Sequence, residues 1–155
     1  MKKIIAMALC LIATTVTANG IDERRVLPVT EMQRNHILTE MRALLAGTQN
    51  ILSALARDDM AVVARHARPL GTGMAHKGED HMQAVLPPEF MQLGMSVHKD
   101  FDQLAADAES LKDPKHTLKQ LSESMNKCVA CHDAYQLRIT DQSAKPRAQP
   151  MQHKH

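Results

Sequence analysis

Two cysteines and a histidine stand close together in the stretch "NKCVACHDAY", residues 126–135. Cys128 and Cys131 are separated by two residues, and His132 follows at once. On a helix the two thiols lie about one turn apart, and the imidazole can turn under a porphyrin ring that both thiols hold. The motif therefore indicates covalent attachment of a haem c, with Cys128 and Cys131 as thioethers and His132 as the proximal iron ligand.

Three other interpretations of the motif stay open. A zinc site needs further ligands, for which four histidines are available in principle: His66, His76, His81 and His98. A redox dithiol is expected in a βαβ context, whereas this sequence shows no strand-like alternation. A structural disulfide across two residues of a helix would be strained. Haem attachment is preferred, and a haem-free metal-binding helical protein is the remaining alternative.

The first residues have the pattern of an export signal. Lys2 and Lys3 precede an apolar run, 4–13, and small or compact residues stand where signal peptidase reads the chain. We expect cleavage after Ala18 and a periplasmic location. No stable membrane insertion is expected, because the run is too short to span a bilayer. Cleavage would discard Cys10 and leave the two cysteines of the motif.

Charge and composition narrow the range of partners. Without Lys2 and Lys3 the 19 basic residues fall to the number of acidic ones, 17. A basic face for nucleic acid is therefore not expected. Aromatic residues are only 2% of the chain, namely Phe90, Phe101 and Tyr135. We expect a buried porphyrin to complete the core that so few rings leave thin, with these three rings lining it.

Apolar residues at helical spacing predict four helices joined by short loops. Pro28 is expected near the first turn of the first helix, and Asp58 or Asp59 as the cap of the second. The expected segments are 29–57, a second helix from about 58 that breaks at 69–73 and runs on to 82, a third over 90–108, and a fourth over 113–135. Four such helices favour an all-α, antiparallel up-and-down four-helix bundle.

The domain organisation follows from these segments. We expect a signal peptide at 1–18, a lead-in at 19–28, a four-helix unit at 29–138 and a disordered tail at 139–155. The tail is rich in Gln, Lys, Pro, Ala and His and shows no periodicity. It contains His153 and His155.

The signal peptide, the four helices and one CxxCH on the last helix, followed by Tyr135, resemble the cytochrome c′ and cytochrome c556 family over residues 29–138. Cys128 and Cys131 match its thioether positions and His132 matches its proximal ligand. The resemblance implies one haem c per chain inside the bundle, redox partner proteins in the periplasm, and a protein that is not an enzyme. Pairing of two bundles into a homodimer through the first two helices is known in the family.

The first helix divides that family by function. A methionine there gives a six-coordinate electron carrier, whereas an apolar residue leaves an open iron that binds nitric oxide or carbon monoxide. Met41 lies on the inner stripe and is the candidate sixth ligand, with Met32 or an unligated iron as alternatives. Leu38, four residues after Arg34, has a spacing similar to that of the gas-binding members. Electron transfer through His132 and Met41 is the first hypothesis, and gas binding is the second.

Two further sets of residues are weaker candidates. The family's basic residue near a haem propionate has no exact counterpart after Tyr135, so Arg138 or Arg34 is expected in that role. His36 lies one residue off the inner stripe and is expected in solvent. His98 lies beside Val97 on the third helix and is a less favoured iron ligand.

Overall fold

The computed structural model describes residues 22–75, 82 and 84–140, and most of these are helical. The expected signal peptide and the part of the expected tail from residue 141 onward lie outside the described residues. The elements occur in the order β1 (Arg25–Val29), α1 (Glu31–Leu55), α2 (Met60–Ala67), η1 (Arg68–Leu70), α3 (Thr72–Ala75), α5 (Pro88–Ser110), α6 (Pro114–Ala134) and β2 (Tyr135–Ile139).

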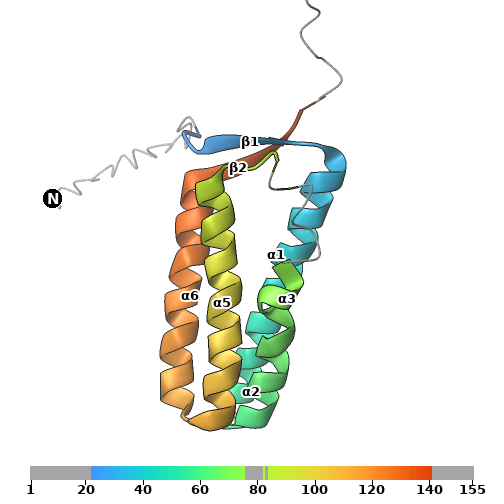
Figure 1. Ribbon diagram of the computed structural model, residues 1–155. Coiled ribbons are helices and arrows are strands. Elements are labelled where there is room, and N and C mark those ends of the chain that lie inside the picture. The colour runs from blue at the N-terminus through green and yellow to red at the C-terminus, as the bar shows by residue number, and fades with distance from the viewer. Residues whose placement is uncertain (1–21, 76–81, 83, 141–155) are drawn as a thin grey trace, which may run out of the picture.

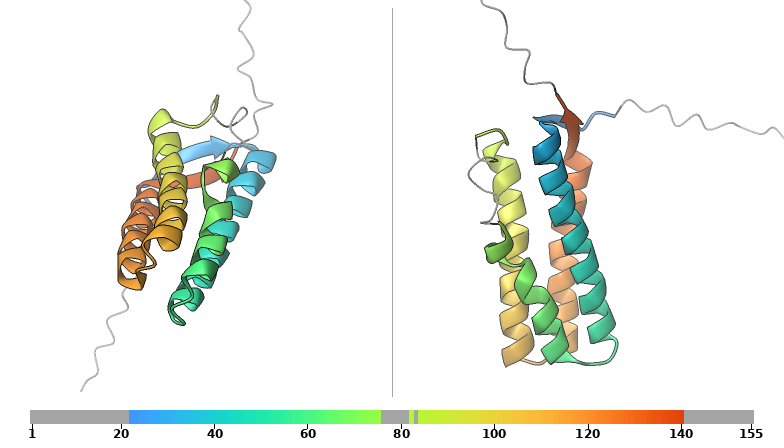
Figure 2. Two further views of the ribbon diagram at one scale, coloured as in Figure 1. Left: turned by 60° about the horizontal axis from the view of Figure 1, so that its bottom comes forward. Right: turned by 90° about the vertical axis from the view of Figure 1, so that its right-hand side faces the viewer.

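The helices α1, α2, α5 and α6 lie side by side, and successive ones run in opposite directions (Figure 1, Figure 2). Helix α1 packs on α2, α2 on α5, and α5 on α6, whereas α1 and α6 contact each other at few positions. The strands cross the end at which α1 begins and α6 ends (Figure 1). The prediction of an all-α chain is confirmed at the level of class, because helices form the body of the described chain.

The helix starts follow from their capping residues. Thr30 and Gln33 form a capping box that starts α1 at Glu31, so this helix is slightly shorter at both ends than the predicted 29–57. Asp59, one of the two expected caps, accepts a hydrogen bond from the backbone N–H of Val62 at 3.1 Å. Asp113 caps α6 in the same way, and a proline follows it at the first helical position.

The second helical segment is broken where proline and glycine predict a break. Helix α2 ends at Ala67, the 3₁₀ turn η1 contains Pro69, and Gly71 adopts an extended backbone before α3. Asp102 of α5 holds this turn, since its Oδ2 accepts hydrogen bonds from the Thr72 backbone N–H at 3.0 Å and hydroxyl at 2.7 Å. The expected continuation toward Met82 crosses residues 76–81, which lie outside the described residues.

Strands β1 and β2 correct the expectation that the chain contains no strands. They pair in parallel with Leu27 opposite Leu137, and Leu27 and Val29 are buried. Pro28 therefore lies in a strand and not in the first helical turn, a position that the edge of a two-stranded sheet permits. Tyr135 begins β2 and does not continue the apolar stripe of α6, and Ile139 is paired and does not begin a disordered tail.

Buried side chains form two separate hydrophobic clusters. The larger is built from α1, α2, α5 and α6, and includes Ile51, Val63, Phe101 and Leu121. The smaller lies under the strands and consists of Leu27, Val29, Ile37, Met82 and Leu86, with Phe90, Met91, Tyr135 and Leu137 packed against it. Across the described residues, every helix is too short or too polar to cross a membrane.

Candidate functional site

A cavity lies between α1, α5 and α6, and residues of all three helices line it. Its wall includes Ile37, Leu86 and Phe90 from the smaller hydrophobic cluster, and Leu44 and Val97 from the larger one. The space between the walls, including the part open to solvent, is about 880 Å³. The cavity therefore interrupts the hydrophobic core between its two clusters.

The three residues of the CxxCH motif all line this cavity. Helix α6 remains regular to Ala134, so Cys128, Cys131 and His132 occupy its last two turns. The thiol of Cys128 donates a hydrogen bond to the Ser124 carbonyl at 3.6 Å, and both cysteines are free thiols in this structure. The structure thus brings together on one wall all three residues that the motif singles out.

Both thiols are held in their neutral form. Partial burial of the sulfur raises the pKa of Cys128, and the charge of Asp100 adds to this effect. Burial, followed by the neighbouring Cys128, raises the pKa of Cys131. Redox-active dithiols depend on a cysteine whose pKa is lowered, so these surroundings argue against the dithiol interpretation.

The zinc interpretation finds no set of ligands among the described residues. Within that part of the chain, no group of three or more His, Cys, Asp and Glu side chains is arranged to hold a metal ion. His66 lies on α2 and does not line the cavity. His76 and His81 fall outside the described residues. A haem iron has a smaller requirement, because the porphyrin supplies its equatorial nitrogens and the protein supplies only axial donors.

The wall across from α6 carries the predicted sixth ligand. Met41 of α1 lines the cavity and is 37% exposed. Met32, the alternative methionine, is 75% exposed and lies away from the cavity. Leu38 does not line the cavity either. His36 does line it, contrary to the expectation of a solvated side chain, and its Nε2 lies 3.4 Å from Oε1 of Glu40.

The lysine in the cavity wall is not one of the basic residues that the sequence indicated. Arg34 and Arg138 do not line the cavity, and Arg138 donates to the side chain of Gln136 at 3.2 Å. Lys127 does line it, with Nζ 2.6 Å from Oδ2 of Asp100. Its position directly before Cys128 is the signal that could have identified it.

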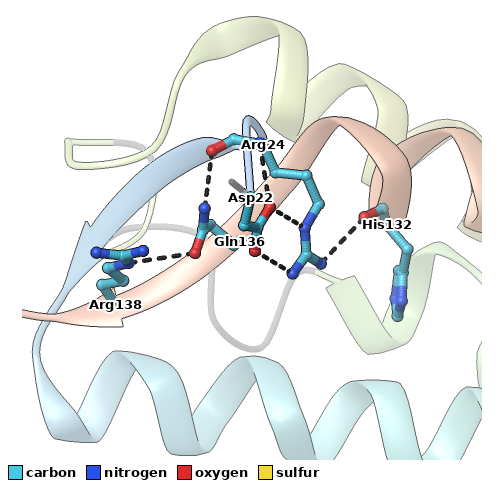
Figure 3. Close-up of polar contacts among 5 residues, drawn as sticks. All are labelled: Asp22, Arg24, His132, Gln136 and Arg138. Carbon is cyan, nitrogen blue, oxygen red and sulfur yellow. Dashed lines mark hydrogen bonds and ion pairs between the residues drawn. The ribbon is translucent and has the colours of Figure 1, made fainter. Parts of the chain in front are cut away.

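Arg24, just before β1, fixes the backbone at the end of α6 (Figure 3). Its Nη1 donates to the carbonyl oxygen of His132 at 3.3 Å, which is one of the carbonyls that a helix end leaves without an intrahelical partner. Asp22 accepts two hydrogen bonds from the same guanidinium, and these lower the pKa of Asp22 to about 2. Gln136 donates to the Arg24 carbonyl at 2.9 Å, and the His132 ring points away from this network.

His98 occupies the α5 wall of the cavity. It is 6% exposed, and its Nδ1 lies 2.7 Å from the carbonyl oxygen of Leu70 in η1. Periodicity alone places this residue on an apolar helix face. Its hydrogen bond depends on the turn at Pro69, which only the folded chain brings near.

Gly94 is a further wall residue, and the sequence pattern gave no sign of its position. It lies on the inward face of α5, four residues after Phe90 and four before His98. Among the described residues, a Cβ atom built at this position would have no atom within 4 Å apart from its chain neighbours and the nearby backbone of its own helix. The inner face of α5 therefore has a gap that opens into the cavity.

Comparison of the chain with protein-family models, with curated proteins and with solved structures finds no match in any of the three.

Proposed function

We propose that this chain is an exported c-type cytochrome that carries single electrons, with one haem c in the cavity between α1, α5 and α6. The observation that supports this most strongly is that Cys128, Cys131 and His132 line one apolar cavity with Met41. In this proposal the helices form an antiparallel up-and-down bundle of the cytochrome c′ and c556 type, and the cofactor completes the core between the two hydrophobic clusters.

The residues of the cavity fit such a cofactor. Its walls are largely apolar, and the two thiols and the imidazole belong to one helix end. A glycine within a helix costs about 1 kcal/mol relative to alanine, and Gly94 leaves empty space where a side chain would otherwise enter the cavity. A flat, largely apolar ring with a covalent tether accounts for these features together.

Each residue has a distinct role in the proposal. A haem bound here supplies a one-electron couple whose potential depends on its axial ligands and burial. Cys128 and Cys131 would tether it, and His132 and Met41 would be the axial donors. Arg24 holds the backbone of His132 at the helix end, which restricts where the imidazole can lie. Lys127 lies in the wall with its Nζ 2.6 Å from Oδ2 of Asp100, and it would be the basic side chain available to a propionate.

Export and partners follow from the same proposal. The signal peptide expected at 1–18 would deliver the chain to the periplasm, where its partners would be redox proteins. A homodimer through the first two helices belongs to the proposal only by resemblance to the family.

The absorption spectrum of protein expressed with haem-maturation machinery tests this function. An electron carrier with His132 and Met41 as ligands should be low-spin and show a sulfur-to-ferric charge-transfer band, which Met41→Ala should abolish. The Met32→Ala variant is the matched control and should retain the band, since Met32 is 75% exposed and outside the cavity. High-spin iron that takes up carbon monoxide freely in the unmodified chain would favour gas binding instead.

A further inference from the structure

His98 is a buried histidine with no role in the function proposed above. It is 6% exposed and lies in the cavity wall that Met41 and His132 also line. Burial of a polar nitrogen without a partner costs free energy, so each ring nitrogen of such a side chain requires an explanation.

The hydrogen bond to Leu70 determines which nitrogen of His98 carries the proton. Nδ1 lies 2.7 Å from the Leu70 carbonyl oxygen, and a carbonyl oxygen can only accept, so the proton is on Nδ1. In the neutral ring Nε2 then has a free lone pair. No group in the described part of the chain donates to that nitrogen.

This arrangement is the one that metal-binding histidines have. They typically donate their second ring N–H to a backbone carbonyl or a carboxylate, which fixes the ring and leaves the other nitrogen to bind the metal. An unprotonated Nε2 cannot donate to a carboxylate, so the propionate of a haem is not its natural partner. An iron atom in the cavity is a partner that accepts its lone pair.

His98 and Met41 stand at corresponding positions of their helices. Each is ten residues past the first residue of its helix, counted from Pro88 in α5 and from Glu31 in α1. At 1.5 Å per residue this places both about 15 Å along their helices. Helices α1 and α5 run in the same direction from the same end of the molecule (Figure 1). The two residues therefore line the cavity from two different helices, at equal distances from the starts of those helices.

We propose that His98 is a second axial ligand of this cavity, a nitrogen donor that replaces the sulfur of Met41 when that sulfur leaves the iron. This inference rests on the proposed function, because it requires haem c in the cavity. The exchange breaks an iron–sulfur bond and forms an iron–nitrogen bond. It moves no electron, and from the neutral ring, whose proton is on Nδ1, it moves no proton. The ring is held in place by Leu70, so little conformational entropy is lost when it binds.

The test compares the ferric absorption and electron paramagnetic resonance spectra of haem-loaded variants. Met41→Ala should stay low-spin, with a spectrum of two nitrogen ligands. Adding His98→Asn should convert it to high-spin, because asparagine can still donate to Leu70 but lacks the second nitrogen. Adding His36→Asn instead is the matched control for a histidine in the same wall, and the low-spin signal should persist.

Imidazole added to the Met41→Ala, His98→Asn protein should restore the low-spin signal, which shows that the missing nitrogen and not a misfolded pocket caused the change. High-spin iron in Met41→Ala alone would overturn the proposal, as would a low-spin signal that survives His98→Asn. The test requires covalently attached haem, which stays bound when the protein is denatured. If no haem stays bound, the proposed function itself fails and this inference fails with it.

Discussion

The motif residues could be identified from sequence because they lie close together in one short segment, at Cys128, Cys131 and His132. Met41 could be placed on an inner stripe by periodicity, and the structure puts it in the cavity. Three other residues of the cavity wall could not be identified in this way: Lys127, His98 and Gly94. Their position in the wall depends on how α5 and α6 pack. A helical pattern shows which face is inward, but not where that face leaves space unfilled.

The Gly94→Ala variant tests separately how position 94 affects the stability of the helix and the binding of the cofactor. In the haem-free protein the change should raise the free energy of unfolding by about 0.5–1 kcal/mol, because alanine is the better helix former and meets no neighbour. In haem-loading cultures the yield of covalent haem should fall, because the methyl group enters the cavity.

Urea unfolding and the ratio of haem to protein measure these two effects. Gly73→Ala is the control, since its Cβ also has nothing within 4 Å and Gly73 lies outside the cavity wall. Equal haem yields from both variants would contradict the role assigned to Gly94.

The helical elements were largely predictable, whereas the strands were not. Proline, glycine and capping residues mark the ends of helices within a few positions, as at Asp59 and Asp113. Strands β1 and β2 are five residues each, and their partners are more than a hundred residues apart in the chain. Such short segments show little alternation, and no local signal reports a parallel partner so distant.

The turn between η1 and α3 depends on Asp102, and Gly71→Ala should disturb it. A Cβ at position 71 would collide with the Asp102 carboxylate, which must then move away from the Thr72 N–H that it caps. The expected loss is about 1 kcal/mol, typical of a removed capping interaction. Urea unfolding of Gly71→Ala beside Gly73→Ala measures it. Stability equal to that of the Gly73 variant would show that Asp102 does not hold the turn.

In the molecule as a whole, the cavity lies among helices of which two, α1 and α6, contact each other at few positions. Its wall takes residues from both hydrophobic clusters. With few aromatic side chains, the chain has little with which to close this gap. The sequence predicted a thin core for this reason, and the proposed cofactor is what would fill it.

Acid should destabilise the folded chain through its exposed carboxylates. Hydrogen bonds from Arg24 lower the pKa of Asp22, and one from the Thr72 N–H lowers that of Asp102. The pKa of Glu89 is lowered by its own backbone N–H and then by Arg25. A lowered folded pKa means that the unfolded chain binds more protons in acid. The stability that these three carboxylates contribute to the folded chain is present above their ordinary pKa values, 4.5 for Glu and 3.8 for Asp. It is lost as the pH falls toward 2.

Urea midpoints at pH 6 and pH 3 check the expectation, and the midpoint should be lower at pH 3. Asp102→Asn should lose less stability than the unmodified chain over that interval, because one titrating group is gone. An unchanged or higher midpoint at pH 3 would contradict the assignment of these carboxylates.

Covalent attachment of a haem to Cys128 and Cys131 is tested by the mass of the intact chain under denaturing conditions. Protein expressed with export and haem-maturation machinery should retain the mass of one haem after acid and organic solvent remove any non-covalent cofactor. The double variant Cys128→Ser, Cys131→Ser should lack this added mass. An unmodified chain that shows only the polypeptide mass under the same conditions would contradict the account.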